Sequence, residues 1–156
     1  MDLKKSLCIM VVKTGRKLLR AMRESLIPFG LTTAQFFLLM TLYQKDRILI
    51  SVLAKKAGLD KATLTGMLDR LERDGLIKRE TAPNDRRAIE ICLRDKALSM
   101  REDLTRLYNE TNQSFLAVLN KEEKQALYSI TEKFENKDLK QLVIKNKPRK
   151  KQGDSA

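Results

Sequence analysis

Apolar residues recur at helical spacing in the first part of the chain, with one interruption. Over Leu3–Ile27 they return every three or four positions between lysines and arginines, until Gly30 ends the pattern. A second, more uniformly apolar segment covers about Ala34–Tyr43, and either Thr32 or Thr33 can cap it. We therefore expect one long amphipathic helix followed by a helix that lies at the centre of the core.

The centre of the chain predicts two short helices joined by a glycine turn. After a polar break at residues 45–49, a helix of about seven residues follows Ser51 and ends at Gly58. A second helix is capped by Asp60 and stops at Gly75, in a pattern typical of a Schellman close. Small and apolar residues occupy the positions where the two helices must cross, which indicates a helix-turn-helix. A helical hairpin inside a core, with no nucleic acid nearby, is the alternative.

A β-hairpin follows these helices directly. Apolar and polar residues alternate on both sides of the turn signal Ala82–Asp85. The order of helix, turn, helix and hairpin predicts a winged helix-turn-helix. The expected fold is mainly α with a small β-hairpin wing, flanked by N- and C-terminal dimerisation helices.

Helical spacing returns after the hairpin. A stripe about 25 residues long starts at Asp95, and Asn120 with Glu123 forms a capping-box pattern that opens a further helix. The course of that helix after Phe134 stays open. Residues 146–156 are basic and nearly free of apolar side chains, so we expect a disordered tail.

The second helix of the motif presents a polar face opposite its apolar face. An α-helix fits the major groove, and its N-terminal residues usually reach the base edges. The DNA-contact candidates on this helix are Lys61, Ala62, Thr63, Thr65, Gly66, Arg70 and Arg73. Lys61, Thr63 and Thr65 are the expected base readers, although Thr63 can equally make a local backbone hydrogen bond. Because Asp69 and Glu72 would repel phosphate, only the first two turns should enter the groove.

The hairpin places two arginines, Arg86 and Arg87, at a tip short enough for a minor groove. Narrow A·T-rich minor grooves attract inserted arginine by their negative potential. Asp85 lies two residues before Arg87, so its carboxylate is expected to accept the guanidinium and hold it in one orientation. The alternative is a solvated turn with a surface ion pair worth under ~1 kcal/mol.

The composition points to an anionic partner and away from catalysis. The 156 residues include 32 Lys and Arg against 20 Asp and Glu, a formal net charge of +12. Most of the excess lies at the ends, since residues 1–30 and residues 137–156 each carry seven basic and two acidic groups. The chain has no histidine, which removes the commonest general base and transition-metal ligand. We therefore expect no enzyme activity, no metal site and no cofactor.

The cysteines and the apolar runs indicate the cellular compartment of the protein. Cys8 and Cys92 lie far apart and belong to no CxxC pair, which fits a reducing cytoplasm. The longest uninterrupted apolar run, Leu7–Val12, is much shorter than the ~20 residues of a membrane span. We expect a cytoplasmic protein with no membrane partner.

Residues 31–97 resemble the MarR family of bacterial transcription regulators. The resemblance rests on Leu31-Thr32-x-x-Gln35-Phe36, on Leu68-Asp69-x-Leu71-Glu72-x-x-Gly75-Leu76-Ile77, and on Asp85-Arg86-Arg87-Ala88. It implies an obligate homodimer in which the first helix and the last two helices intertwine, two winged motifs that bind a pseudo-palindrome, and a small-molecule or redox signal that changes their spacing. It also implies that Arg87 is the wing arginine and Asp85 its orienting acid. The sequence departs from many relatives at Gly66, where some carry a long polar reader, so part of the usual base readout is in doubt.

These observations predict a division of labour along the chain. We expect residues 31–94 to form the DNA-binding domain, residues 1–30 and 95–145 a helical dimerisation region, and residues 146–156 a basic tail. Long helices striped on one face support the homodimer independently, because one chain has no evident core to cover them all. The expected function is a sequence-specific, ligand-responsive repressor that binds pseudo-palindromic operators in double-stranded DNA.

The signal that would release the repressor is less defined by the sequence. A small apolar or anionic molecule, bound between the dimer helices and the winged motif, is the leading expectation. Redox sensing through Cys8 is an alternative, although its apolar surroundings favour a packed structural cysteine over a reactive one. A non-specific architectural nucleic-acid binder and a thiol enzyme using Cys8 are the remaining alternatives.

Overall fold

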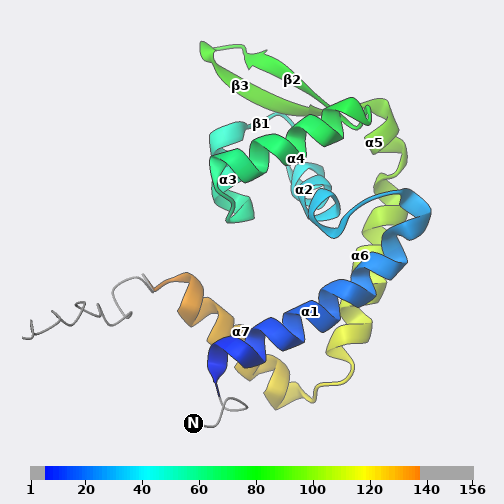
Figure 1. The fold of residues 1–156 in the computed structure, drawn as a ribbon, viewed down its shortest axis with the longest axis vertical. Helices are drawn as coiled ribbons and strands as arrows, with labels where there is room; N and C mark the ends of the chain where they lie inside the picture. The colour runs from blue at the N-terminus through cyan, green and yellow to red at the C-terminus, as the bar shows by residue number, and fades with distance from the viewer. Residues whose placement is uncertain (1–5, 138–156) are drawn as a thin grey trace, which may run out of the picture. The chain divides into compact units, whose positions relative to one another are not determined.

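The structure, a computed structural model, describes residues 6–137 and divides between Phe115 and Leu116 into two compact units (Figure 1). The first unit is mainly helical with a small sheet, as the sequence predicts, and the described part of the second unit, up to residue 137, contains one helix. The first unit consists of α1 (Leu7–Leu26), the 3-10 turn η2 (Ile27–Phe29), α2 (Thr33–Gln44), β1 (Ile48–Leu49), α3 (Ile50–Ala57), α4 (Lys61–Arg73), β2 (Ile77–Ala82), β3 (Asp85–Leu93), α5 (Asp95–Ser99) and α6 (Arg101–Leu116). The second unit contains α7 (Lys121–Glu135).

The helix-turn-helix consists of α3, a tight turn and α4. Gly58 closes α3 in the left-handed conformation (φ +63°), a region that L side chains rarely adopt. At the far end of α4, the Leu76 N–H donates to the Leu71 carbonyl and the Gly75 N–H donates to the Glu72 carbonyl. These two bonds form the expected Schellman close, which directs the chain into β2.

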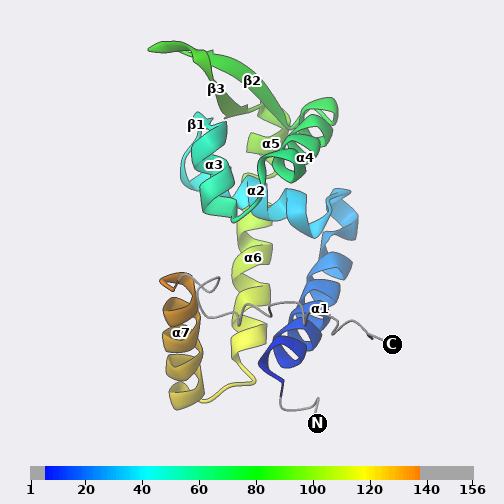
Figure 2. The same cartoon turned by 60° about the vertical axis from the view of Figure 1, so that its left-hand side comes forward.

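The wing is an antiparallel hairpin of β2 and β3, and Figure 2 shows it extending away from the helices. Pro83 and Asn84 alone separate the two strands. The sheet has a third strand, β1, which pairs antiparallel with β3 so that Ile48 lies opposite Ile91. The wing is therefore anchored at its base by residues that precede α3.

The core of the first unit holds α4 in one rotational setting. Leu64, Leu68 and Leu71 of α4 are completely buried, and they belong to one cluster with Leu53 of α3 and Phe36 of α2. Fully burying a leucine or phenylalanine side chain contributes about 1.5–3 kcal/mol. Because three leucines of α4 face inward, the opposite face of the helix must face solvent.

The predicted caps are confirmed. Thr32, rather than Thr33, caps α2 and forms a capping box with Gln35. Asn120 and Glu123 form the expected capping box at the start of α7, which ends at Glu135.

The single helix of about 25 residues expected from Asp95 is wrong, because the chain tightens at Met100. The Ser99 hydroxyl donates to the Lys96 carbonyl at 2.9 Å, and the Met100 N–H donates to the Ala97 carbonyl at 3.2 Å. The Met100 bond is of the i to i−3 type instead of the regular i to i−4 type, and α5 ends at Ser99 while α6 begins one residue after Met100.

The polar break expected at residues 45–49 is also corrected, since it contains β1. In addition, α3 begins at Ile50, so that Ser51 lies inside the helix and not before it. The expected helix start at Leu3, the course of the chain after residue 137 and the tail at 146–156 lie outside the described residues.

No single helix among residues 6–137 is long and apolar enough to cross a membrane. By length and composition alone, one pair passes that test together, Leu7–Phe29 with α2, and its two parts are bent by 77°.

Candidate nucleic-acid interface

The first turn of α4 is organised by Asp60. Its carboxylate accepts the Thr63 backbone N–H at 2.9 Å and the Thr63 hydroxyl at 2.7 Å. The hydroxyl bond, more than any other contact, lowers the pKa of Asp60 below its usual value. The Thr63 hydroxyl proton is therefore committed to the helix cap, which favours the local role over base reading.

The candidate residues of α4 are all exposed and surround its solvent face. At 100° per residue, Ala62, Gly66 and Arg73 lie opposite the buried leucines. Lys61 and Thr65 lie along one flank of that face, and Thr63 and Arg70 lie along the other. A Cβ added at Gly66 would meet no atom within 4 Å, so the helix surface at this position is open.

The Thr65 hydroxyl is also engaged within the helix. It donates to the Lys61 carbonyl at 2.8 Å, four residues back. A serine or threonine hydroxyl has one proton and two acceptor lone pairs. Thr65 is therefore left in this structure with acceptor capacity toward a DNA donor.

At the tip of the wing, Arg86 and Arg87 are exposed at the start of β3. Neither guanidinium is in an ion pair with any residue of the described range 6–137. The expected partner of Asp85 is wrong: its carboxylate accepts the backbone N–H of Arg87 at 2.9 Å instead of the guanidinium. Asp85 therefore shapes the turn at the strand start, because a short side chain reaches the backbone two residues on more easily than the end of a long arginine.

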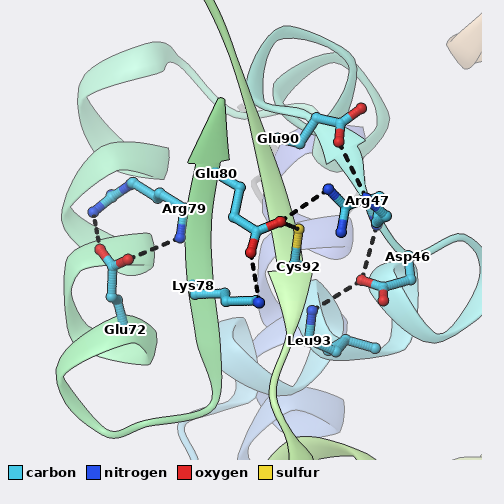
Figure 3. Close-up of polar contacts among 9 residues, drawn as sticks. All are labelled: Asp46, Arg47, Glu72, Lys78, Arg79, Glu80, Glu90, Cys92 and Leu93. Carbon is cyan, nitrogen blue, oxygen red and sulfur yellow. Dashed lines mark hydrogen bonds and ion pairs between the residues drawn. The ribbon is translucent and has the colours of Figure 1, made fainter. Parts of the chain in front are cut away.

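Arg79 on β2 is a contact residue of α4 that the sequence pattern did not single out. Figure 3 shows its guanidinium against Glu72, with Nη1 to Oε2 at 2.6 Å, and Nη2 lies 2.7 Å from Oδ1 of Asp69. The Arg79 backbone N–H also donates to Glu72 at 2.9 Å. Residues two apart in a strand share a face, so the buried Ile77 could have indicated that Arg79 points toward the helices.

A second group of charges lies at the base of the wing (Figure 3). Glu80 and Glu90 are direct cross-strand partners, an arrangement that repels. Arg47, which has a positive φ of 54°, lies between them, with its guanidinium 2.9 Å from Glu80 and 3.4 Å from Glu90. The contact to Glu90 is an ion pair without hydrogen-bond geometry, and Oε2 of Glu90 has no hydrogen-bond partner among the described residues.

The remaining contacts of this group explain its charge state. Lys78 pairs with Glu80 at 2.5 Å, and this hydrogen bond lowers the pKa of Glu80 despite partial burial. Cys92 is buried beside it, with its sulfur 3.6 Å from the Glu80 carboxylate. Burial, more than any other effect, raises the pKa of the Cys92 thiol. The thiol is therefore kept protonated, and this cysteine is a structural residue of the wing base.

A cavity of about 450 Å³ lies beside the helix-turn-helix in the first unit. Most of its lining is apolar or aromatic, with Lys56 as the one cation among the lining residues. The side chains around it come from α2, α3, α4, α6 and the turn before α4: Ala34, Phe37, Leu38, Met40, Thr41, Gln44, Lys56, Ala57, Leu59, Met67 and Tyr108.

Comparisons with known proteins match this architecture. Residues 31–89 match the model of the MarR family. The organic hydroperoxide resistance transcriptional regulator of Bacillus subtilis is 26% identical over 145 residues, covering 88% of this chain and 95% of the relative. A mutant MarR from E. coli, solved with operator DNA, is 28% identical with a TM-score of 0.78, covering 86% of this chain and 99% of that one.

A further solved structure supports the fold alone. BpsR of Bordetella bronchiseptica, described as regulated in its DNA binding by 6-hydroxynicotinic acid, is 21% identical. Its TM-score is 0.81, over 88% of this chain and 99% of that one. The winged helix-turn-helix, the family match over residues 31–89 and the relatives matched along most of their length agree: residues 31–89 have the winged-helix region of the MarR family, and the chain is similar over most of its length to DNA-binding transcriptional regulators.

Proposed function

We propose that this protein is a homodimeric, ligand-responsive repressor that binds pseudo-palindromic operators in double-stranded DNA. In this proposal, α4 enters the major groove and the wing tip enters the adjacent minor groove. The contacts come from Lys61, Ala62, Thr63, Thr65, Gly66, Arg70 and Arg73 of α4, and from Arg86 and Arg87 of the wing, with Asp85 shaping the turn. Such a regulator acts where the chromosome lies, so we also propose a cytoplasmic location.

One observation carries the proposal: the cations of α4 and of the wing tip are exposed while the buried leucines hold α4 in place. Lys61, Arg70, Arg86 and Arg87 are in no ion pair with a residue of the described range, so their charges are available to phosphates and bases. Arg73 contacts only its neighbour Asp74, at 3.6 Å. A structural helical hairpin would not require a row of uncompensated cations on its solvent face.

Exposed apolar side chains support the homodimer. On α1, only Met22 and Leu26 are buried, whereas six large apolar residues between Leu7 and Leu19 are 40–62% exposed: Leu7, Met10, Val11, Val12, Leu18 and Leu19. On α7, Leu127, Tyr128, Ile130 and Phe134 are 41–54% exposed. Apolar stripes of this kind on single chains mark surfaces that another protein covers, and a second copy supplies matching stripes.

The cavity supports a small-molecule effector. An apolar lining with one cation suits a small apolar molecule or an organic anion that places its charge near Lys56. The same cavity contacts Leu59, two residues before α4, and Met67, in the middle of α4. An occupant can therefore bias the position of the helix that we propose reads DNA.

Redox sensing through Cys8 is the second candidate, and one observation favours it. Cys8 is exposed on α1 in the single chain, although the sequence led us to expect a packed residue. The relative in Bacillus subtilis is named for organic hydroperoxide resistance. In a dimer a partner would cover this apolar surface of α1. Cys8 would then be buried and would act as a packed structural residue.

Random-site selection on duplex DNA, followed by gel shifts at one fixed salt concentration, tests the proposal. We expect a pseudo-palindromic site that binds at least ~10³-fold more tightly than unrelated duplex of the same length. The operator proposal fails if no site is enriched and the logarithm of the binding constant falls with the logarithm of salt concentration equally for all duplexes. The protein would then be a non-specific architectural binder.

A further inference from the structure

The contacts of Arg79 link the wing directly to α4. The side chain starts on β2 and is only 25% exposed, and its two terminal nitrogens reach Asp69 and Glu72 at 2.7 and 2.6 Å. One of these nitrogens also lies 3.4 Å from the Thr65 backbone carbonyl. Arg79 therefore spans two turns of the flank of α4 that carries Thr65.

These two acids would otherwise oppose DNA binding. Asp69 is one turn beyond Thr65, and Glu72 is on the same flank, close to where a phosphate backbone would pass a bound helix. Carboxylates near phosphates repel them, and pairing with an arginine cancels that charge within a few ångströms. The α4 segment itself has three cations and two acids, so without Arg79 its net charge would be small.

Direct contact between Arg79 and a phosphate fits the structure less well. Both terminal nitrogens are already bound to carboxylates, and a paired, three-quarters buried guanidinium has few donors left for DNA. The other wing arginines, Arg86 and Arg87, are exposed at the tip.

We propose that Arg79 is a positioning residue for DNA binding that acts through Asp69 and Glu72. It neutralises the acidic flank of α4 and fixes β2, and with it the wing, against that helix. This inference rests on the proposed function, because it assumes that α4 and the wing contact DNA.

The test is a double-mutant cycle on the selected operator. Arg79→Gln should weaken binding about tenfold at physiological salt, since two carboxylates become uncompensated beside phosphates. Asp69→Asn with Glu72→Gln should restore affinity to within about threefold in the Arg79→Gln background, yet raise it little in the wild-type background. Thermal unfolding of each variant, measured without DNA, shows whether the loss and its rescue come from folding; we expect the affinity to change by more than the stability accounts for.

Arg94→Gln is the matched control, because it removes one exposed arginine that is in no ion pair with a described residue. It should change operator affinity by less than about twofold. Unchanged affinity in Arg79→Gln would overturn the inference. So would additive effects with a salt slope lowered by ~0.9, because these indicate a direct phosphate contact.

A further variant separates the inference from the proposed function. If Arg87→Ala weakens operator binding and Arg79→Gln does not, only the role of Arg79 fails. If neither variant changes the affinity for the selected site, the wing assignment itself fails.

Discussion

At the residue scale, hydrogen bonds within α4 decide which side chains are free to read DNA. Thr63 donates its hydroxyl proton to Asp60, and Thr65 donates its own to the Lys61 carbonyl. With these bonds kept, both hydroxyls can only accept, so they suit donors such as the amino groups of adenine and cytosine. On the first two turns of α4, the remaining residues that can determine base specificity are then Lys61 and the small residues Ala62 and Gly66.

The wing arginine carries the first residue-scale prediction. Arg87→Ala should lose about 1–3 kcal/mol of operator binding free energy, concentrated at A·T-rich positions under the wing, because an exposed guanidinium leaves the minor groove. Binding titrations on operators with single base-pair changes measure this loss. An affinity equal to that of wild type at every position would refute the wing assignment.

Asp85→Asn is the matched control for that prediction. The carboxylate accepts a backbone N–H, and an asparagine oxygen can accept the same bond, so Asp85→Asn should cost far less than Arg87→Ala. Equal losses in the two variants would mean that the charge of Asp85 holds the guanidinium in the complex.

At the element scale, Tyr43 ties α2 to the helices that follow the wing. Its hydroxyl donates to the Ala97 carbonyl of α5 at 2.6 Å, and Arg101 of α6 donates to the Tyr43 carbonyl at 2.8 Å. The Arg101 guanidinium also lies 5.7 Å from the centre of the Tyr43 ring. Burial raises the pKa of Tyr43 to about 12, although Arg101 opposes the shift.

Tyr43→Phe should lower the free energy of unfolding by about 1 kcal/mol, because the buried Ala97 carbonyl loses its donor. The phenol ionises near pH 10 when unfolded and near pH 12 when folded, so its stabilising contribution is complete below pH 10 and is lost as pH rises to 12. Denaturant unfolding across this range should show a steeper loss for wild type than for Tyr43→Phe.

Tyr128→Phe provides the comparison, since Tyr128 is 54% exposed on α7. This substitution should leave the free energy of unfolding nearly unchanged. The interpretation of Tyr43 would be wrong if the two variants behaved alike.

Elements with local signals could be predicted from the sequence, and those held by distant contacts could not. Asp60, Gly58 and Gly75 act within a few residues of their own positions, so the helix-turn-helix and its ends follow from spacing. β1 exists because Ile48 pairs with Ile91 and the Asp46 carboxylate accepts the Leu93 N–H at 2.9 Å, across more than forty residues. Arg79 was missed for a similar reason, because its partners lie on another element.

At the scale of the whole molecule, the net charge of +12 and the proposed site describe different parts of the chain. The excess lies at residues 1–30 and 137–156, whereas residues 51–93 have nine basic and seven acidic groups. Ends of this kind supply salt-sensitive, sequence-independent attraction. Selectivity, in our account, depends on how the few available cations of α4 and the wing are placed.

A homodimer would present the DNA-contacting surface of α4 and the wing twice. Two copies of α4 related by a twofold axis fit successive major grooves on one side of a duplex, roughly 34–36 Å apart. The exposed stripes of α1 and α7 supply the apolar surface for such pairing.

Hydroxyl-radical footprinting of the selected operator tests this account most directly. We predict two protected stretches of deoxyribose backbone whose centres are about 10–10.5 base pairs apart, related by the symmetry of the site, each flanked by further protection where a wing lies over the minor groove. A single protected segment, or uniform protection along the duplex, would contradict it.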